Sequence, residues 1–324
     1  MPDSPVPMPS LGDHEHAVLA IDVGGTDIKI ALVESDGSII GLRRVPTKVN
    51  GEHTVATVVH TVAREAKQLA VDYPTIRPAA AGVIVPGIVD EEAGVCVYAR
   101  NLDWHNEPIR AQFEAALSLP VAFGHDVRTA GDAELQLGAG TGVRDAMVVV
   151  IGTGIASAVF VNGSPVVSRG FAGEIGQNRV ASTVYSAAVG DGPAAPTLEE
   201  IASAGAIARR YAEQSGEQVQ GSREVLDRML GGDPVASRVW NEATSALANC
   251  IAQAAGMIAP EVILLAGGLA LAGQHLVEPI ERHLDVELTI QRRPQLILAQ
   301  LGGDAGLIGS ALKARALAAG ERTP

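Results

Sequence analysis

The stretch of sequence that decides the fold is AIDVGGTDIKIALV, which occupies residues 20–33. Two apolar runs flank an acid, two glycines and a threonine, so the pattern predicts a β-hairpin with a tight turn at Gly24-Gly25. Because glycine has no Cβ and tolerates positive φ, the N–H groups of this turn can approach a ligand closely. With the carboxylate of Asp22 and the hydroxyl of Thr26, the turn suits a phosphate chain that carries a metal ion. Taken alone, the stretch is equally consistent with an ordinary structural hairpin.

The same pattern returns at residues 147–163, MVVVIGTGIASAVFVNG. Both stretches consist of an apolar strand, a Gly/Thr turn, a second apolar strand and a polar turn that contains glycine, so one structural unit occurs twice in the chain. Two α/β lobes, each with such a turn, can face each other across a cleft. The recurrence makes a phosphate clamp a better interpretation of the turns at residues 24–26 and 152–154 than two unrelated hairpins.

The composition limits the classes of function. A chain of 324 residues is longer than one typical core, which favours two lobes, and its formal net charge of −13 argues against a nucleic-acid partner. No apolar stretch reaches membrane-spanning length without glycine or charged residues, and residues 1–15 lack the apolar segment of a secretory leader. Cys96 and Cys250 lie in apolar runs and are expected to be buried thiols in a reducing compartment. We therefore expect a cytoplasmic protein with no membrane or nucleic-acid partner.

Apolar periodicity predicts alternating strands and helices along the rest of the chain. Helices are expected at residues 53–70, 109–117, 129–137, 198–211, 241–258 and in a terminal segment up to 318, strands at 80–85, 121–123, 262–265 and 295–300, and a loop at 181–197. We expect a disordered tail at residues 1–16, a small α/β lobe formed by 17–123 with 308–320, and a large α/β lobe at 124–307.

Acids and glycines follow the predicted strands at positions where open α/β sheets bind ligands. Asp126 comes soon after the strand at 121–123, although a helix N-cap explains an acid there equally well. The turn at Gly267-Gly268 would let a base or ribose lie against the backbone, and a purely structural turn is an equally good interpretation. Phosphoryl transfer fits this set, because it needs a phosphate cradle, Mg²⁺ and a base. The motifs GxxxxGK[ST], GxSxG and HExxH do not occur, and no GxGxxG follows the first strand.

Taken together and in order, these motifs resemble those of the ROK family (repressor, open reading frame, kinase) of sugar kinases, within the actin-like/hexokinase ATPase superfamily. The resemblance covers nearly the whole chain from about residue 17. It implies a two-lobed actin-like ATPase (ribonuclease H-like) α/β fold with duplicated mixed β-sheet lobes and a central cleft. It also implies ATP and Mg²⁺ as cofactors, a small-molecule sugar and a nucleotide as ligands, and a homodimer.

The resemblance assigns roles to individual residues. Asp126, in His125-Asp126, corresponds to the catalytic base of the family, and Asp22 would hold Mg²⁺, through water. The residues that the resemblance places at the phosphates or the nucleotide are Asp22, Gly24, Gly25, Thr26, Lys29, Gly152, Thr153, Gly154, Gly267 and Gly268. Those that it places at the sugar are Pro86, Gly87, Asn101, His125, Asp126, Glu174, Gln177 and Glu199.

The chain departs from the family pattern at the sugar end of the expected site. Gln177 stands where the family has the His of Glu-x-Gly-His, and Arg128 stands where it has Asn. The cysteine-rich zinc motif is absent apart from its last element, which includes Glu199, so no structural zinc is expected.

The expected activity is ATP-dependent phosphorylation of a hexose hydroxyl, the 6-hydroxyl of glucose or a related aldose, with Asp126 as general base. The alternatives are a catalytically silent sugar-binding or regulatory protein of the same fold, and a kinase for N-acetylmannosamine, N-acetylglucosamine or fructose. Polyphosphate in place of ATP is a third alternative.

Overall fold

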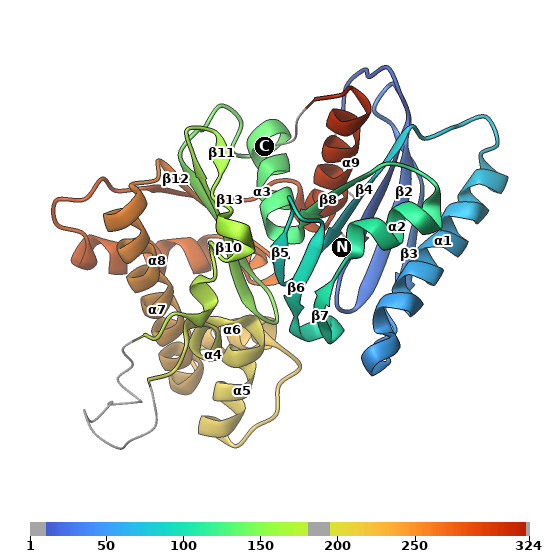
Figure 1. Cartoon of the computed structure of the whole chain (residues 1–324). Coiled ribbons are helices and arrows are strands. Elements are labelled where there is room, and N and C mark those ends of the chain that lie inside the picture. Colours follow the sequence, from blue (N-terminus) through green and yellow to red (C-terminus); the bar gives the residue numbers. More distant parts are fainter. Residues whose placement is uncertain (1–10, 181–194, 322–324) are drawn as a thin grey trace. The chain divides into compact units, whose positions relative to one another are not determined.

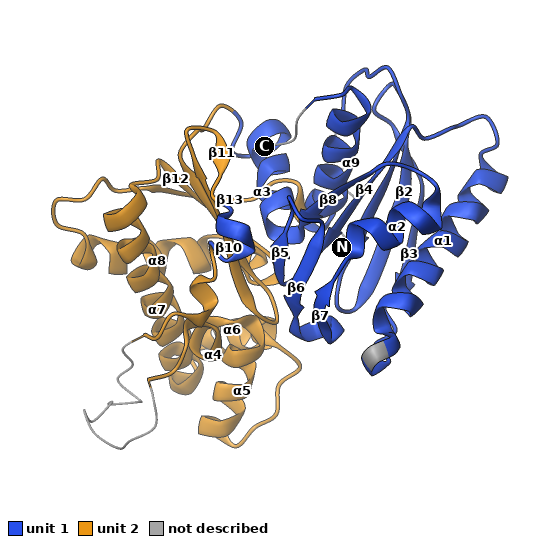
Figure 2. Ribbon diagram, viewed as in Figure 1, with its two compact units in different colours: residues 1–141, 167–172, 303–324 blue, residues 142–166, 173–302 orange. Residues whose placement is uncertain are grey.

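The computed structural model describes residues 11–180 and 195–321, and the chain divides into two compact units (Figures 1 and 2). Unit 1 comprises residues 1–141, 167–172 and 303–324, and unit 2 comprises residues 142–166 and 173–302. The two predicted lobes, 17–123 with 308–320 and 124–307, stay a prediction. The compact units differ from them mainly because helix α3 (Asp126–Leu137) packs on helix α9 (Ala305–Ala318) and therefore belongs to unit 1.

Unit 1 is built on a five-stranded mixed sheet with the order β3-β2-β1-β4-β8. Its strands are β1 (Val18–Val23), β2 (Asp27–Val33), β3 (Ile39–Pro46), β4 (Ala80–Val85) and β8 (Val121–His125). The first three are antiparallel neighbours, while β1, β4 and β8 run parallel. The predicted hairpin is therefore present, with Asp22 opposite Lys29 in the register.

Residue alternation along β1 explains how helices cover both faces of this sheet. Leu19, Ile21 and Val23 pack with α1 (Thr54–Asp72) and α2 (Ile109–Leu117), whereas Val18 and Ala20 pack with α9. A smaller antiparallel sheet of β5 (Ile88–Asp90), β6 (Val95–Ala99) and β7 (Trp104–Glu107) completes the unit, together with the 3₁₀ turns η1 (Gly51–His53), η2 (Arg100–Leu102) and η3 (Ser168–Gly170).

Unit 2 repeats the sheet of unit 1. Its strands are β9 (Ala146–Ile151), β10 (Ile155–Val161), β11 (Ser164–Pro165), β12 (Val262–Ala266) and β13 (Gln295–Leu298), in the order β11-β10-β9-β12-β13. Hairpin β9–β10 corresponds to β1–β2, and the parallel strands β12 and β13 correspond to β4 and β8. The internal repeat seen in the sequence is therefore a repeat of topology, and the predicted duplicated mixed sheets are confirmed.

The core of unit 2 forms where its helices pack against its sheet. They are α4 (Leu198–Ala202), α5 (Ala204–Ser215), α6 (Ser222–Leu230), α7 (Pro234–Ile258) and α8 (Gln274–Glu287), with 3₁₀ turns η4 (Ile175–Gln177), η5 (Gly268–Ala272) and, at the boundary with unit 1, η6 (Gly302–Asp304). The predicted single helix at 198–211 was wrong, because Ser203 is extended, with ψ 154°, and its hydroxyl caps α5. Helix α7 begins seven residues earlier than expected, where Asp233 caps its first turn.

The predicted tail is held in place over the part that the structure describes. Arg315 of α9 donates hydrogen bonds to the carbonyl oxygens of Leu11, Gly12 and Glu34, at 3.0, 2.9 and 2.6 Å. Leu11 and Gly12 of the predicted tail are therefore bound through their backbone to a buried guanidinium, and the disorder of the tail as a whole stays a prediction. Residues 1–10 of that tail, and residues 181–194 of the predicted loop, lie outside the described residues. Across the described chain, no helix is both long and apolar enough to cross a membrane.

Candidate active site

The first Gly/Thr turn connects β1 to β2 in unit 1. The N–H of Gly24 donates to the carbonyl oxygen of Asp27 at 2.9 Å, and the Thr47 hydroxyl donates to the Gly24 carbonyl oxygen at 2.7 Å. Neither Gly24 nor Gly25 has a positive φ, so the turn does not depend on the freedom of glycine to adopt one. Glycine is required at position 24 for another reason: a Cβ there would lie 2.9 Å from the Asp27 carbonyl oxygen. Gly25 and Thr26 are exposed at the tip.

Two carboxylates lie around the ammonium group of Lys29 beside this turn. Lys29 Nζ is 3.5 Å from Asp22 Oδ2 and 3.9 Å from Asp304 Oδ1, and it also donates to the carbonyl oxygen of Gly303. Burial raises the pKa of Asp22, and the charge of Lys29 opposes that effect. Carboxylate oxygens beside an exposed turn are the ligands that Mg²⁺ prefers, so this donor set fits a hydrated Mg²⁺.

Two loops that the resemblance places at the sugar are packed close to the sheet of unit 1. Asn101, in η2, lies against the first turn, because a Cβ added to Gly25 would be 3.1 Å from Asn101 Cβ. Gly87 follows Pro86 at the end of β4 with φ +100°, and a Cβ at this position would overlap the Tyr98 carbonyl oxygen. Asn101 and the first Gly/Thr turn are therefore neighbours, and their expected roles stay a prediction.

Asp126 is the first residue of α3, directly after β8, and its side chain is 31% exposed. Its Oδ1 accepts the N–H of Val127 at 2.6 Å and lies 3.2 Å from His125 Nε2. The N-cap of α3 is His125 rather than Asp126, since His125 Nδ1 accepts the Arg128 N–H at 3.2 Å. His125 is 3% exposed, so its ring is not on the surface where the resemblance expects a sugar ligand.

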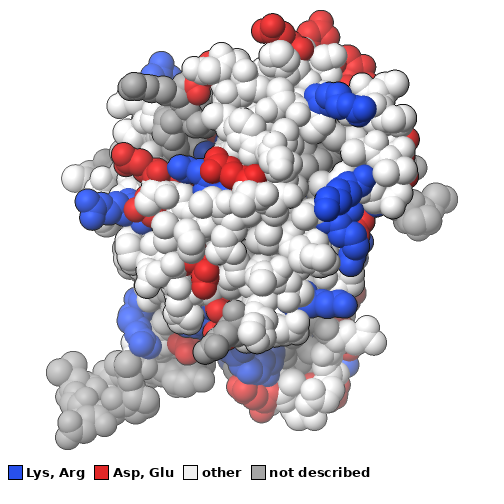
Figure 3. All heavy atoms as spheres, turned by 45° about the vertical axis from the view of Figure 1, so that its right-hand side comes forward, with Lys and Arg blue, Asp and Glu red and all other residues white. Residues whose placement is uncertain are grey.

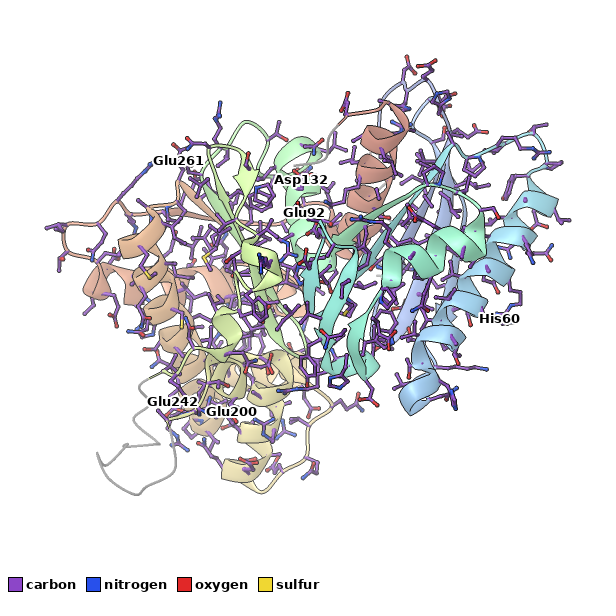
Figure 4. The ribbon with its side chains drawn as sticks, viewed as in Figure 1. His60, Glu92, Asp132, Glu200, Glu242 and Glu261 are labelled. Atoms are coloured by element: carbon purple, nitrogen blue, oxygen red, sulfur yellow. The ribbon has the colours of Figure 1, made fainter. Side chains whose placement is uncertain are left out.

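A partly buried ion cluster lies next to this pair. Glu91 Oε1 accepts from Arg128 Nε at 2.8 Å, and Glu91 Oε2 accepts from Lys313 Nζ at 2.8 Å. Burial alone would raise the pKa of Glu91, but the charges of Lys313 and Arg128 outweigh it and hold the pKa below its usual value. Asp132 of α3, labelled in Figure 4, also interacts with the charge of Lys313, and burial raises the pKa of its carboxyl. Sequence reasoning missed Glu91 and Lys313, which carry no motif and come from distant segments.

The second Gly/Thr turn connects β9 to β10 in unit 2. Gly152 N–H donates to the Gly154 carbonyl oxygen at 2.9 Å, while Thr153 is exposed at the tip. Glu199 Oε2, from α4, accepts the N–H of Ile155 at 2.9 Å, and a Cβ added to Gly154 would lie 2.6 Å from that oxygen. Glu199, which the resemblance places at the sugar, therefore supports the turn in this structure.

Two further glycine loops of unit 2 pack against the same hairpin. Gly267 has φ +85°, and its position leaves no room for a side chain, because a Cβ would lie 2.5 Å from the Ile151 carbonyl oxygen. Gly176, in η4, is buried against the Ile155 carbonyl oxygen, which leaves Glu174 half-buried and Gln177 exposed beside it. Both loops therefore lie close to the second turn.

A pocket lies beside the Gly267-Gly268 turn in unit 2. It is lined by Gly268, Leu269 and Ala272 of η5, by Arg223 and Leu226 of α6, and by Trp240 of α7. The lining is mostly apolar, and an apolar pocket next to a backbone that carries no side chain suits a flat ring. Within the described residues, no group of three His, Cys, Asp or Glu side chains could hold a metal ion.

The expected site residues thus form two groups, one in each unit. Unit 1 contains the first turn with Asp22 and Lys29, the loops at Pro86-Gly87 and Asn101, and His125-Asp126. Unit 2 contains the second turn, Gly267-Gly268, Glu174, Gln177 and Glu199. Burial raises the pKa of Cys96 to about 12 and that of Cys250 to about 11, so both thiols stay protonated and neither is a nucleophile.

Comparison with known proteins identifies the family. The model of the ROK family matches residues 18–316. The glucokinase of Halalkalibacterium halodurans is 28% identical over 313 residues, covering 90% of this chain and 92% of that protein. The N-acetylmannosamine kinase of Yersinia pestis is 29% identical over 302 residues, covering 92% of this chain and 98% of that protein.

The solved structures agree in fold. A ROK family glucokinase from Streptomyces griseus, in complex with glucose and AMPPNP, superposes with a TM-score of 0.74 at 26% identity, covering 92% of this chain and 99% of that one. The predicted actin-like ATPase fold is confirmed by this likeness and by the repeated sheet order. Because the family model spans nearly the whole chain, the protein belongs to the ROK family.

Proposed function

We propose that this ROK sugar kinase transfers the γ-phosphate of ATP to a hexose hydroxyl, the 6-hydroxyl of glucose or a related aldose, with Asp126 as the general base. The position of Asp126 carries the proposal: a partly exposed carboxylate begins α3 at the carboxyl end of a parallel strand, held by the Val127 N–H. Relatives that are glucokinases support the choice of glucose, and an N-acetylmannosamine kinase among them supports the alternative.

In the proposed reaction, Asp126 accepts the proton of the attacking hydroxyl. The hydroxyl oxygen forms a bond to the γ-phosphorus as the bond to the β–γ bridging oxygen breaks, and ADP leaves. A carboxylate is a weak base, but it suffices when the proton is transferred late, after the phosphoryl group has begun to bind the acceptor oxygen. Bound Mg²⁺ would offset phosphate charge, and Asp22 would hold it through water.

The two turns would bind the phosphates through backbone N–H groups and the hydroxyls of Thr26 and Thr153, with Lys29 nearby. The adenosine would lie at Gly267-Gly268 and enter the pocket formed by η5, α6 and α7. The proposal requires the groups of unit 1 and unit 2 to act on one pair of substrates.

At the sugar, we assign direct contacts to Asn101, Glu174 and Gln177, with Pro86 and Gly87 shaping the loop. An amide and a carboxylate suit sugar hydroxyls, which both donate and accept hydrogen bonds. His125 and Glu199 take supporting positions, because the first is buried and the second binds the Ile155 N–H.

An ADP-release assay with glucose, mannose, fructose, N-acetylglucosamine and N-acetylmannosamine tests the activity and the sugar together. We expect turnover to be highest with glucose. Turnover only with N-acetylmannosamine or another of these sugars would overturn the substrate. If calorimetry detects sugar binding but none of the five sugars is turned over, the catalytically silent protein is favoured. Product formation from polyphosphate without nucleotide would overturn ATP as the donor.

We further propose a cytoplasmic homodimer, as the resemblance implies. The free, buried thiols of Cys96 and Cys250 support a reducing compartment. Figure 3 shows acidic and basic side chains side by side on the left of the drawn face and several basic side chains, one below the other, on its right. Light scattering coupled to gel filtration would give a mass of one chain if the dimer proposal is wrong.

A further inference from the structure

The two ring nitrogens of His125 face two different partners. Nδ1 accepts the backbone N–H of Arg128 at 3.2 Å, and a nitrogen that accepts a hydrogen bond bears no proton. In a neutral imidazole the single proton then lies on Nε2. Nε2 is 3.2 Å from Asp126 Oδ1, so the nitrogen that carries the proton lies within ion-pair distance of the carboxylate.

The surroundings of His125 disfavour a second proton on the ring. The side chain is buried, and burial followed by the charge of Arg128 lowers the pKa of His125 to about 3, with Glu91 acting in the opposite direction. The charged groups facing it are Asp126 and Arg128 from α3, and Glu91 from the loop after β5, whose other oxygen binds Lys313 of α9. Glu91 is already paired with Arg128 and Lys313, and its opposing effect is smaller than that of burial and of the charge of Arg128.

Arg128 anchors this arrangement from both of its ends. Its backbone N–H fixes the acceptor nitrogen of His125, while its guanidinium donates to Glu91 Oε1 at 2.8 Å and to the Val89 carbonyl oxygen at 2.9 Å. Arg128 and His125 are both 3% exposed, so their own side chains are shielded from water. A residue that departs from the family pattern on the sugar side thus has a structural function behind the base.

We propose that His125 is a positioning residue for the catalytic base: the Arg128 N–H selects its Nε2–H tautomer, and that tautomer holds the Asp126 carboxylate in its ionised form. This inference rests on the proposed function of Asp126. A donor beside a carboxylate favours the charged state, so loss of the donor raises the pKa of the base and moves the acid limb of the rate profile to higher pH.

Two matched substitutions separate the two nitrogens. In His125→Asn the amide oxygen can replace Nδ1 as the cap of α3, but no donor reaches the Nε2 position. In His125→Gln the amide nitrogen can replace Nε2, but the cap is lost. We expect His125→Asn to keep the melting temperature and to shift the acid limb of kcat/KM upward by about one pH unit. We expect His125→Gln to keep the acid limb and to lower the melting temperature.

The pH profiles decide the inference. It is overturned if the acid limb of His125→Asn coincides with that of the wild type, or if both variants shift it equally. KM for ATP should be unchanged in both variants, because neither substitution touches the turns of the phosphate site.

A second readout needs no catalysis and therefore distinguishes failure of this inference from failure of the proposed function. Two-bond ¹H–¹⁵N correlation spectra identify the tautomer of each histidine, and His125 is assigned as the signal missing from both variants. We expect an Nε2–H ring that stays neutral at pH 5. An Nδ1–H tautomer, or titration near the ordinary pKa of histidine, would overturn the positioning role even in an active kinase. Full turnover by Asp126→Asn would instead overturn the base while leaving the tautomer as described.

Discussion

Glu199 accepts the backbone N–H of Ile155 at 2.9 Å, which ties the start of α4 to the second Gly/Thr turn. Removing this carboxylate should loosen the turn, so we expect Glu199→Ala to raise KM for ATP by about tenfold, the effect of roughly 1.4 kcal/mol. Glu199→Gln keeps an acceptor oxygen and is the matched control, for which we expect a smaller increase in KM for ATP. Steady-state kinetics with each substrate varied would show the effect. A change confined to KM for the sugar would instead place Glu199 at the sugar.

The two glycines of that turn provide a matched pair. A Cβ at Gly154 would lie 2.6 Å from Glu199 Oε2, whereas a Cβ at Gly152 would meet no atom within 4 Å. Gly154→Ala should therefore displace Glu199 and lower the free energy of unfolding by about 1 kcal/mol through loss of its hydrogen bond to Ile155, and Gly152→Ala should leave it nearly unchanged. Urea unfolding of both variants tests this difference. Equal losses would show that the contact with Glu199 is not the cause.

Replacing the base should abolish chemistry while keeping substrate binding. We expect Asp126→Asn to lower kcat by about 10³-fold, within the range for general-base catalysis, with sugar affinity retained because the amide is of equal size. Stopped assays for kcat and calorimetry for binding measure the two effects separately. Near-normal turnover would show that another group accepts the proton.

The carboxylate of Asp22 should govern the dependence on Mg²⁺. Asp22→Asn preserves size but removes charge, so the Mg²⁺ concentration for half-maximal rate should rise by about tenfold or more. Asp304→Asn is the informative comparison, since its carboxylate is 3.9 Å from the same lysine nitrogen. If neither variant changes the Mg²⁺ requirement, the metal is held elsewhere.

The shared carboxylate of Glu91 makes stability depend on pH. Its pKa is lower in the folded protein than the usual value, because Lys313 and Arg128 outweigh the effect of burial. A depressed pKa contributes stability above the unfolded pKa of about 4.3, and this contribution is lost as the pH falls through the folded value. Glu91→Gln should lower the free energy of unfolding by about 3 kcal/mol at pH 7, because two cations then lack their carboxylate partner. The free energy of unfolding of this variant should also depend less on pH between 5 and 3 than that of the wild type. Urea titrations across that range measure both effects, and an unchanged pH dependence would contradict the assignment.

Local patterns in the sequence predicted the elements and the turns well. The hairpin at residues 20–33 and its repetition at 147–163 depend on strand alternation and glycine placement, which short segments encode directly. Helix ends depended on single caps, so the break at Ser203 and the early start at Asp233 were missed. In both cases a side chain that binds backbone N–H groups outweighed apolar spacing.

Contacts between distant segments could not be predicted from patterns. Glu91 and Lys313 are 222 positions apart and carry no motif, yet they meet at 2.8 Å. The role of Arg128 depends on its contact with the same carboxylate of Glu91. The sequence alone shows only that Arg128 departs from the family pattern at a position expected near the sugar. The hydrogen bonds from Arg315 to Leu11 and Gly12 are contacts of the same kind.

The return of α9 to unit 1 has a consequence for synthesis on the ribosome. Val18 and Ala20 of β1, the first strand to be made, are covered by a helix that follows the whole of unit 2 in the chain. The Ser310 hydroxyl even bridges the backbone of Ile21, at 3.1 Å to both its nitrogen and its oxygen. During translation the N-terminal unit of a protein usually folds first. Unit 1 of this chain cannot complete its core in that order, because α9 is synthesised after unit 2. Unit 2 can finish folding while one face of the earlier sheet is still uncovered, and an uncovered apolar face of this kind favours aggregation of the nascent chain.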